Sequence, residues 1–150
     1  MNLFDICDRT VMPIAYRLGF IMNVYREPII RQFEAEFGLI RPEWTILLCL
    51  AEQDGLTARD ICDMTGLLRN AISRGVALLE KKGLITRQSD RADGRLMRLS
   101  MTDDGQAIFA RIEPILQARE AALLSVIPEA ERERFRGYLD LLCRQVQEMA

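Results

Sequence analysis

Apolar side chains recur at intervals of three and four residues along most of the chain, which predicts a mainly helical protein. The first such pattern covers residues 11–37 and is expected to form one long helix. Pro28 lies inside it, where a proline removes a backbone hydrogen bond and favours a kink. Residues 1–9 are expected to form a short arm that leads into this helix. A second helix should begin at Pro42, because proline suits the first helical positions.

Residues 57–82 carry a pattern typical of two short helices joined by a tight turn. Thr57 can cap the first helix through its hydroxyl, and Gly66 stands where that helix should end. The second helix is expected over about 67–82, with an apolar stripe made of Leu68, Ile72, Val76 and Leu79. Its other side carries donors of the kind that contact bases and phosphates, namely Arg69, Asn70, Ser73 and Arg74. A helix with these two faces is typical of major-groove recognition.

A basic hairpin is expected directly after this helix. Residues 84–89 and 95–100 have strand-like composition, and the Asp93-Gly94 pair between them is a strong turn signal. Leu56 is a plausible third strand. The segment 66–99 holds eight basic and three acidic side chains, a net charge of +5 in a chain whose net charge is −2. Positive charge gathered in this way favours a phosphate backbone as partner.

The segment resembles the multiple antibiotic resistance regulator (MarR) family of winged helix-turn-helix proteins. Three ordered motifs carry the resemblance: LLEKKGLI at 78–85, DRADGR at 90–95 and LSMTDDG at 99–105. It extends over nearly all 150 residues. It implies one mainly α (α+β) domain over 1–150, with a winged helix-turn-helix region at 41–101 and a helical dimerisation region at 1–40 and 102–150.

Composition narrows the possible functions further. Apolar residues make up 49% of the chain and charged residues 28%, as in a globular domain. The sequence has no histidine, which removes the commonest general base and metal ligand. Its cysteines are scattered without a C-x-x-C pair, at Cys7, Cys49, Cys62 and Cys143. We therefore expect no metal site, no cofactor and no enzyme. No apolar run approaches the ~20 residues of a membrane span, so a cytoplasmic protein is expected.

The resemblance assigns DNA-contacting roles beyond the recognition helix. It implies that Arg95, at the tip of the wing, enters the minor groove, with Asp93 steadying it. Whether Arg91 or Arg95 reaches deeper stays open. Phosphate contacts are expected from basic side chains around the unit: Arg59, Arg87, Arg91, Arg98 and Lys81, of which Lys81 could equally be a partner of the helix dipole.

Similar proteins dimerise through their terminal helices. A two-fold dimer would present two recognition helices to major grooves roughly 34 Å apart on a palindromic operator. The resemblance implies a repressor that is released by a small aromatic or phenolic anion. Candidate residues of the ligand site are Met12, Tyr16, Arg17, Phe20, Trp44, Leu48 and Ile112. Among them only Arg17 offers anion recognition, and the same stripe also fits plain core packing.

Two alternatives remain open at this level. Cys7 lies early enough to resemble the reactive cysteine of peroxide-sensing relatives, but the neighbouring carboxylates of Asp5 and Asp8 disfavour a thiolate. The unit could also be a winged-helix protein-interaction module that binds no DNA. The net charge of +5 argues against this second alternative.

Overall fold

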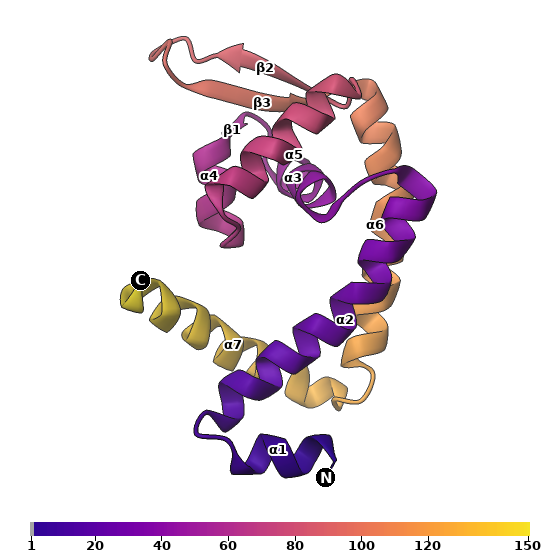
Figure 1. Ribbon diagram of the computed structural model, residues 1–150, viewed down its shortest axis with the longest axis vertical. Helices are drawn as coiled ribbons and strands as arrows, with labels where there is room; N and C mark the ends of the chain where they lie inside the picture. The colour runs from indigo at the N-terminus through magenta and orange to yellow at the C-terminus, as the bar shows by residue number, and fades with distance from the viewer. Residues whose placement is uncertain (1) are drawn as a thin grey trace. The chain divides into compact units, whose positions relative to one another are not determined.

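The computed structural model describes residues 2–150 and divides into two compact units, the residues up to Phe109 and Ala110–Ala150 (Figure 1). The first unit contains the winged helix-turn-helix fold, and α6 continues from it into the second. The elements are α1 (Leu3–Arg9), α2 (Pro13–Phe37), α3 (Arg41–Glu52), β1 (Leu56–Thr57), α4 (Ala58–Thr65), α5 (Arg69–Lys81), β2 (Ile85–Ser89), β3 (Met97–Met101), α6 (Asp103–Leu124) and α7 (Glu129–Met149).

The segment expected as a short N-terminal arm forms the helix α1. Asn2 and Asp5 make a reciprocal capping box, in which each side chain accepts a hydrogen bond from the other's backbone N–H, at 3.0 and 2.8 Å. Arg17 on α2 holds α1 in place by an ion pair with Asp8 and a 3.0 Å hydrogen bond to the Cys7 carbonyl. Seven residues are too few to form a stable helix alone, so this contact matters.

The helix α2 is continuous through Pro28 and ends at Gly38 in the left-handed conformation, φ +64°. Phe33, near its end, is fully buried and packs edge-to-face against Trp44 of α3, with ring centroids 5.6 Å apart. The rest of the core of this unit is formed by side chains of α3, α4, α5 and the sheet. Its fully buried side chains include Ile46, Leu47, Ile61, Ile72, Leu79 and Leu99.

The recognition helix lies very close to α3. A Cβ atom added at Gly75 would stand 2.8 Å from Ile46 Cδ1 and 3.0 Å from Pro42 Cβ, so a larger residue would require these neighbours or α5 to shift. Ile72, Val76 and Leu79 are buried as predicted. The prediction for Leu68 is wrong: it is 73% exposed, because it is the N-cap residue of α5 and lies outside the helical repeat.

Three antiparallel strands form the sheet, in the order β1-β3-β2. The expected short strand at Leu56 is present and pairs with Leu99 of β3. The third strand begins at Met97 and not at Arg95, because Arg95 lies in the turn that connects β2 and β3. The wing is therefore a short paired ribbon with a longer tip, residues 90–96, than the pattern predicted.

The LSMTDDG motif joins the base of the wing to α6. The Thr102 hydroxyl donates to the Gly83 carbonyl at 2.7 Å and accepts from the Gly105 N–H at 3.1 Å. A Cβ at Gly105 would lie 2.1 Å from the Leu84 carbonyl oxygen, which no side chain tolerates. Threonine caps the helix, and glycine allows the helix to touch the wing.

A buried ion pair connects the end of α2, the start of α3 and the end of α5. The Glu43 carboxylate is fully buried, and its Oε1 lies 2.5 Å from Lys82 Nζ. Its Oε2 accepts from the Ile40 N–H at 2.8 Å, and Lys82 also donates to the Gly38 carbonyl at 2.6 Å. Lys82, the second lysine of the LLEKKGLI motif, therefore has an internal partner.

The second unit consists of the remainder of α6 and α7. The helix α6 is continuous through Pro114, and α7 begins after Pro128. Arg132 donates to the Ile127 carbonyl at 3.0 Å across the connection. None of the α7 side chains is buried, and its exposed apolar residues are Phe135, Tyr138, Leu141, Leu142, Val146 and Met149. Among the described residues, no helix is both long and apolar enough to cross a membrane.

Candidate nucleic-acid interface

The N-terminus of α5 offers hydrogen-bond donors to solvent. Its N-cap residue, Leu68, has no side-chain acceptor for the first backbone N–H groups. The amide oxygen of Asn70 accepts from the N–H of Ala71 at 2.8 Å, which leaves its NH₂ group facing outward as a donor. Free N–H groups and the positive end of the helix dipole together favour a phosphate at this position.

The four predicted recognition residues lie on the exposed side of α5. Arg69, Asn70, Ser73 and Arg74 are all exposed, and within residues 2–150 neither arginine has an ion-pair partner. An arginine without an internal partner keeps its planar fork of donors for a base edge or a phosphate. The apolar face of the helix, including Ile72 and Val76, is buried. This matches the two-faced helix that the sequence predicts.

Leu68 is a candidate contact that the sequence analysis missed. Assigned to the core from its spacing, it is exposed beside Arg69. An apolar side chain at this end of a recognition helix can pack against a thymine methyl group. The signal was present in the sequence, because Leu67 and Leu68 follow the helix-ending Gly66 directly and one of them had to lie in the turn.

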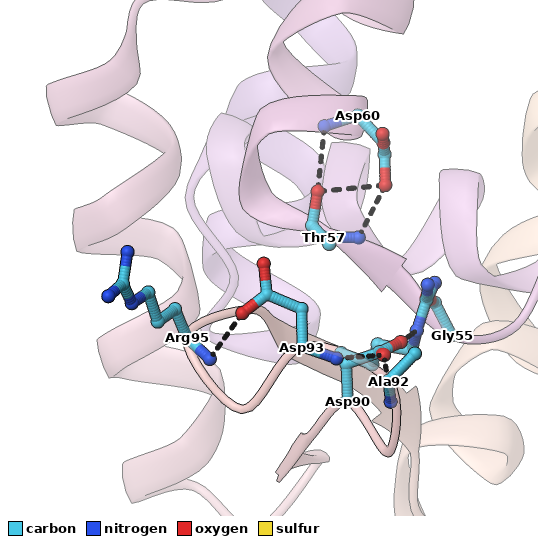
Figure 2. A network of polar contacts seen from close by, with 8 residues as sticks. Gly55, Thr57, Asp60, Asp90, Ala92, Asp93 and Arg95 are labelled. Carbon is cyan, nitrogen blue, oxygen red and sulfur yellow. Dashed lines mark hydrogen bonds and ion pairs between the residues drawn. The ribbon is translucent and has the colours of Figure 1, made fainter.

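The tip of the wing is folded around the Asp90 carboxylate (Figure 2). Its Oδ1 accepts from the N–H groups of Ala92 and Asp93 at 2.8 and 3.0 Å, and its Oδ2 pairs with Arg98. These bonds, with that of Asp93 first, lower the pKa of Asp90 to about 2. The carboxylate is therefore charged at any physiological pH and fixes the start of the turn.

The side chain of Asp93 supports the backbone of Arg95. The Asp93 Oδ1 accepts from the Arg95 N–H at 3.0 Å, and Figure 2 shows the guanidinium of Arg95 extending away from this carboxylate. Both Arg91 and Arg95 are exposed, and neither has an ion-pair partner among the described residues. The tip thus presents two free arginines, as a minor-groove contact requires.

Three of the predicted phosphate-contacting arginines already have acidic partners. Arg87 pairs with Glu80, whose hydrogen bond raises the pKa of that guanidinium. Arg98 pairs with Asp90 and donates to the Gly55 carbonyl at 2.9 Å. Arg59 lies 3.9 Å from Asp63 and is otherwise open to solvent. Lys81 is exposed and has no ion pair within residues 2–150.

Part of the predicted ligand site comes together on α2. Met12, Tyr16 and Phe20 line one open depression of about 340 Å³. Arg17 does not line it, because its guanidinium is bound to Asp8, to the Cys7 carbonyl and to the Pro13 carbonyl. Trp44 and Leu48 lie on α3, where Trp44 is buried with its indole N–H unpaired. Ile112 belongs to the second unit.

The thiol groups offer little to an oxidant. Cys7 is 2% exposed, and Cys49 is buried, which raises the pKa of its thiol. Cys62 is half-buried and Cys143 exposed, and all four cysteines are free. Reactive cysteines need an accessible, electropositive environment. The alternative of redox sensing through Cys7 gains no support from this burial.

Comparison with known proteins shows which family the chain resembles. The sequence profile described as MarR family matches residues 37–96, which span α3 to the wing. A transcriptional repressor of Mycobacterium tuberculosis is 24% identical over 142 residues, covering 95% of this chain and 98% of that protein. A putative regulatory protein for the hcr operon of Thauera aromatica is 28% identical over 148 residues, covering 96% and 89%. The chain is similar to the MarR family over its winged helix-turn-helix region.

The fold of the chain matches solved structures. A putative MarR family regulator from Listeria monocytogenes, crystallised with a 26mer DNA, superposes with a TM-score of 0.85 at 22% identity, covering 90% of this chain and 89% of that one. This similarity confirms the predicted mainly helical fold with its winged helix-turn-helix. The two curated relatives named above are a transcriptional repressor and a putative transcriptional regulatory protein.

Proposed function

We propose that this protein is a MarR-family repressor that binds a palindromic DNA operator as a homodimer and is released by a small aromatic or phenolic anion. The recognition helix α5 reads the major groove, and the tip of the wing enters the adjacent minor groove. The named relative from M. tuberculosis is a repressor, which favours repression here.

One observation carries the DNA-binding part of the proposal. Four exposed arginines without acidic partners within residues 2–150 lie on the two elements that would touch DNA: Arg69 and Arg74 on α5, and Arg91 and Arg95 on the tip of the wing. Other arginines of this unit, such as Arg17, Arg87 and Arg98, are engaged internally. Four free guanidinium groups gathered on this surface suit a polyanion better than an ordinary protein partner.

Exposed apolar side chains on the terminal helices support the homodimer. Val11 is 100% exposed, Ile14 61%, and Val146 and Met149 of α7 are 63% and 75% exposed. Apolar surface of this extent usually marks an interface. A second copy of the chain would also supply the second recognition helix that a palindromic site needs.

The DNA-binding proposal is tested by titrating a fluorescent operator candidate, the DNA just upstream of the regulator's own gene, at several salt concentrations. Arg74→Ala should weaken binding more than tenfold, because a bidentate arginine contact contributes ~1–3 kcal/mol. Arg31→Ala is the control, since it removes an exposed arginine from α2, outside the proposed DNA-binding surface. Equal binding by the two variants would contradict the docking of α5.

The proposed ligand site is the depression lined by Met12, Tyr16 and Phe20. Aromatic and thioether side chains around an open hollow suit a planar ring. Recognition of the anion by Arg17 would require this arginine to leave Asp8, so a negatively charged ligand would also loosen α1 from α2. Such a rearrangement would give the ligand a different affinity for two states, which release from DNA requires.

Release is tested with salicylate as the probe on the preformed protein–DNA complex. We expect salicylate to lower operator affinity of the native protein and to lose this effect in Phe20→Ala. Met22→Ala, a neighbouring residue of equal exposure outside the depression, is the control. If Phe20→Ala responds like the native protein, the ligand site lies elsewhere.

A further inference from the structure

Arg98 connects two parts of the winged helix that are far apart in sequence. Its Nε pairs with Asp90 at the start of the wing turn, and its Nη1 donates to the carbonyl of Gly55, before β1, at 2.9 Å. Gly55 in turn donates its N–H to the Leu99 carbonyl at 3.0 Å. A single guanidinium therefore joins the tip of the ribbon to the segment that enters the helix-turn-helix.

The segment at the other end of this connection is itself rigid. In the register of the sheet, Arg98 is opposite Thr57, which caps α4. Thr57 and Asp60 form a complete capping box, with bonds of 2.8 Å from the Thr57 N–H and 3.2 Å to the Thr57 hydroxyl (Figure 2). Arg98 thus ties the tip of the wing to the capped first turn of the helix-turn-helix.

The Asp90 end is equally well defined. Both carboxylate oxygens are used, Oδ1 by two backbone N–H groups of the turn and Oδ2 by Arg98, and the Asp90 side chain is only 12% exposed. Movement of the Arg98 guanidinium toward a phosphate would leave Oδ2 of Asp90 and the Gly55 carbonyl without the donor that Arg98 supplies. Such a loss costs more than an exposed phosphate contact returns.

We propose that Arg98 is a positioning residue of the wing, which sets where Arg91 and Arg95 meet the minor groove, and is not itself a phosphate contact. The inference rests on the proposed DNA-binding function. It makes Arg98 a determinant of sequence preference in the DNA beneath the wing. Minor-groove arginines favour narrow A·T tracts, and this preference requires the tip to arrive at a fixed depth and angle.

Replacement by lysine separates the two roles. Lysine keeps the positive charge that a phosphate contact needs, but its single ammonium cannot reproduce the planar fork that joins Asp90 and Gly55. Asp90→Asn is the second variant. The asparagine oxygen still accepts from Ala92 and Asp93, so the turn is kept while the ion pair with Arg98 is lost.

The experiment measures operator affinity of the full chain at several salt concentrations, on sites whose flanks under the wing are A·T-rich or G·C-rich. We expect Arg98→Lys, Arg98→Gln and Asp90→Asn all to lose the A·T preference of the native protein. Their slopes of log affinity against log salt should equal the native slope. Arg91→Gln, an unpaired arginine on the same tip, is the control and should lower the slope by roughly one. Circular dichroism confirms that each variant is folded.

Two other results would overturn the inference about Arg98 without contradicting the proposed DNA binding. If Arg98→Lys keeps both the native slope and the A·T preference while Arg98→Gln lowers the slope by roughly one, Arg98 contacts a phosphate. If Asp90→Asn keeps the preference, the Asp90–Arg98 pair does not position the wing. Failure of the proposed function looks different, because the native protein would then show no salt-dependent DNA binding at all.

Discussion

The buried pair of Glu43 and Lys82 gives a sharp stability prediction. Lys82→Met should lower the free energy of unfolding by about 2–3 kcal/mol, because it leaves a fully buried carboxylate without its cation. Breaking a buried ion pair usually costs about 3–5 kcal/mol. The Lys82 side chain is 36% exposed, so water can reach the site and reduces this cost.

A substitution of Glu43 tests whether the unpaired carboxylate causes this loss of stability. Glu43→Gln should cost only about 1 kcal/mol, since its oxygen can still accept from the Ile40 N–H and the charge left without its partner, on Lys82, is 36% exposed to water. Combined with Lys82→Met, it should recover part of the lost stability. The two losses are then strongly non-additive, by at least about 1 kcal/mol.

Urea unfolding at one fixed protein concentration, followed by circular dichroism, measures these differences. Lys81→Met is the matched control, because Lys81 is exposed and has no ion pair within residues 2–150. It should change stability by less than about 0.5 kcal/mol. If Lys82→Met and Lys81→Met unfold at the same urea concentration, the buried pair does not hold α3 against the end of α5.

Other predictions concern glycine, pH and the recognition helix. Gly105→Ala should destabilise the protein by more than about 2 kcal/mol in thermal unfolding, because its Cβ would overlap the Leu84 carbonyl. Gly137→Ala, with open space around it, should stabilise α7 by about 0.5–1 kcal/mol. Equal effects of the two variants would contradict the close approach of Gly105 to Leu84. The pKa of Asp90 lies at about 2, below its unfolded value, so its contribution to stability is fully present above about pH 4 and is lost as pH falls toward 2. Urea midpoints of the native protein and Asp90→Asn should therefore differ at pH 5 and converge near pH 2; a difference unchanged between those pH values would exclude this ionisation as the source. Gly75→Ala should lower stability, because α5 or its neighbours Pro42 and Ile46 must shift, and it should weaken DNA binding if α5 is the part that moves; unchanged operator affinity would show that the neighbours absorb the shift.

Periodicity and local signals predicted most of the winged helix correctly. The capping residue Thr57, the helix-ending Gly66 and Gly83, and the short strand at Leu56 act within a few residues of sequence. Interactions of this range can be read from a single chain, because each depends on backbone conformation nearby. The exposed donors of α5 followed from the same periodicity.

The errors arise where distant residues decide the outcome. The helix α1 depends on Arg17, which comes from the next helix, and so its seven residues looked like an arm. The apolar spacing placed Leu68 in the core because α5 begins at Arg69, two residues later than assumed.

The same limit applies to the candidate interface. From the sequence, three arginines of the wing, Arg87, Arg91 and Arg98, are grouped as phosphate contacts, and Arg95 is set apart for the minor groove. Their partners divide them, since Arg87 and Arg98 are bound to Glu80 and Asp90, whereas Arg91 and Arg95 are free of ion pairs within residues 2–150. Pairing across strands brings these groups together, and charge counting along the sequence does not detect it.

The most direct test of the account is the affinity of the regulator for its upstream DNA, measured by fluorescence anisotropy for the native protein and Arg74→Ala at two salt concentrations. The account predicts tight binding to a palindromic site that weakens with salt, and a more than tenfold loss in the variant. Binding that is absent, indifferent to salt or unchanged by Arg74→Ala would contradict a recognition helix in the major groove.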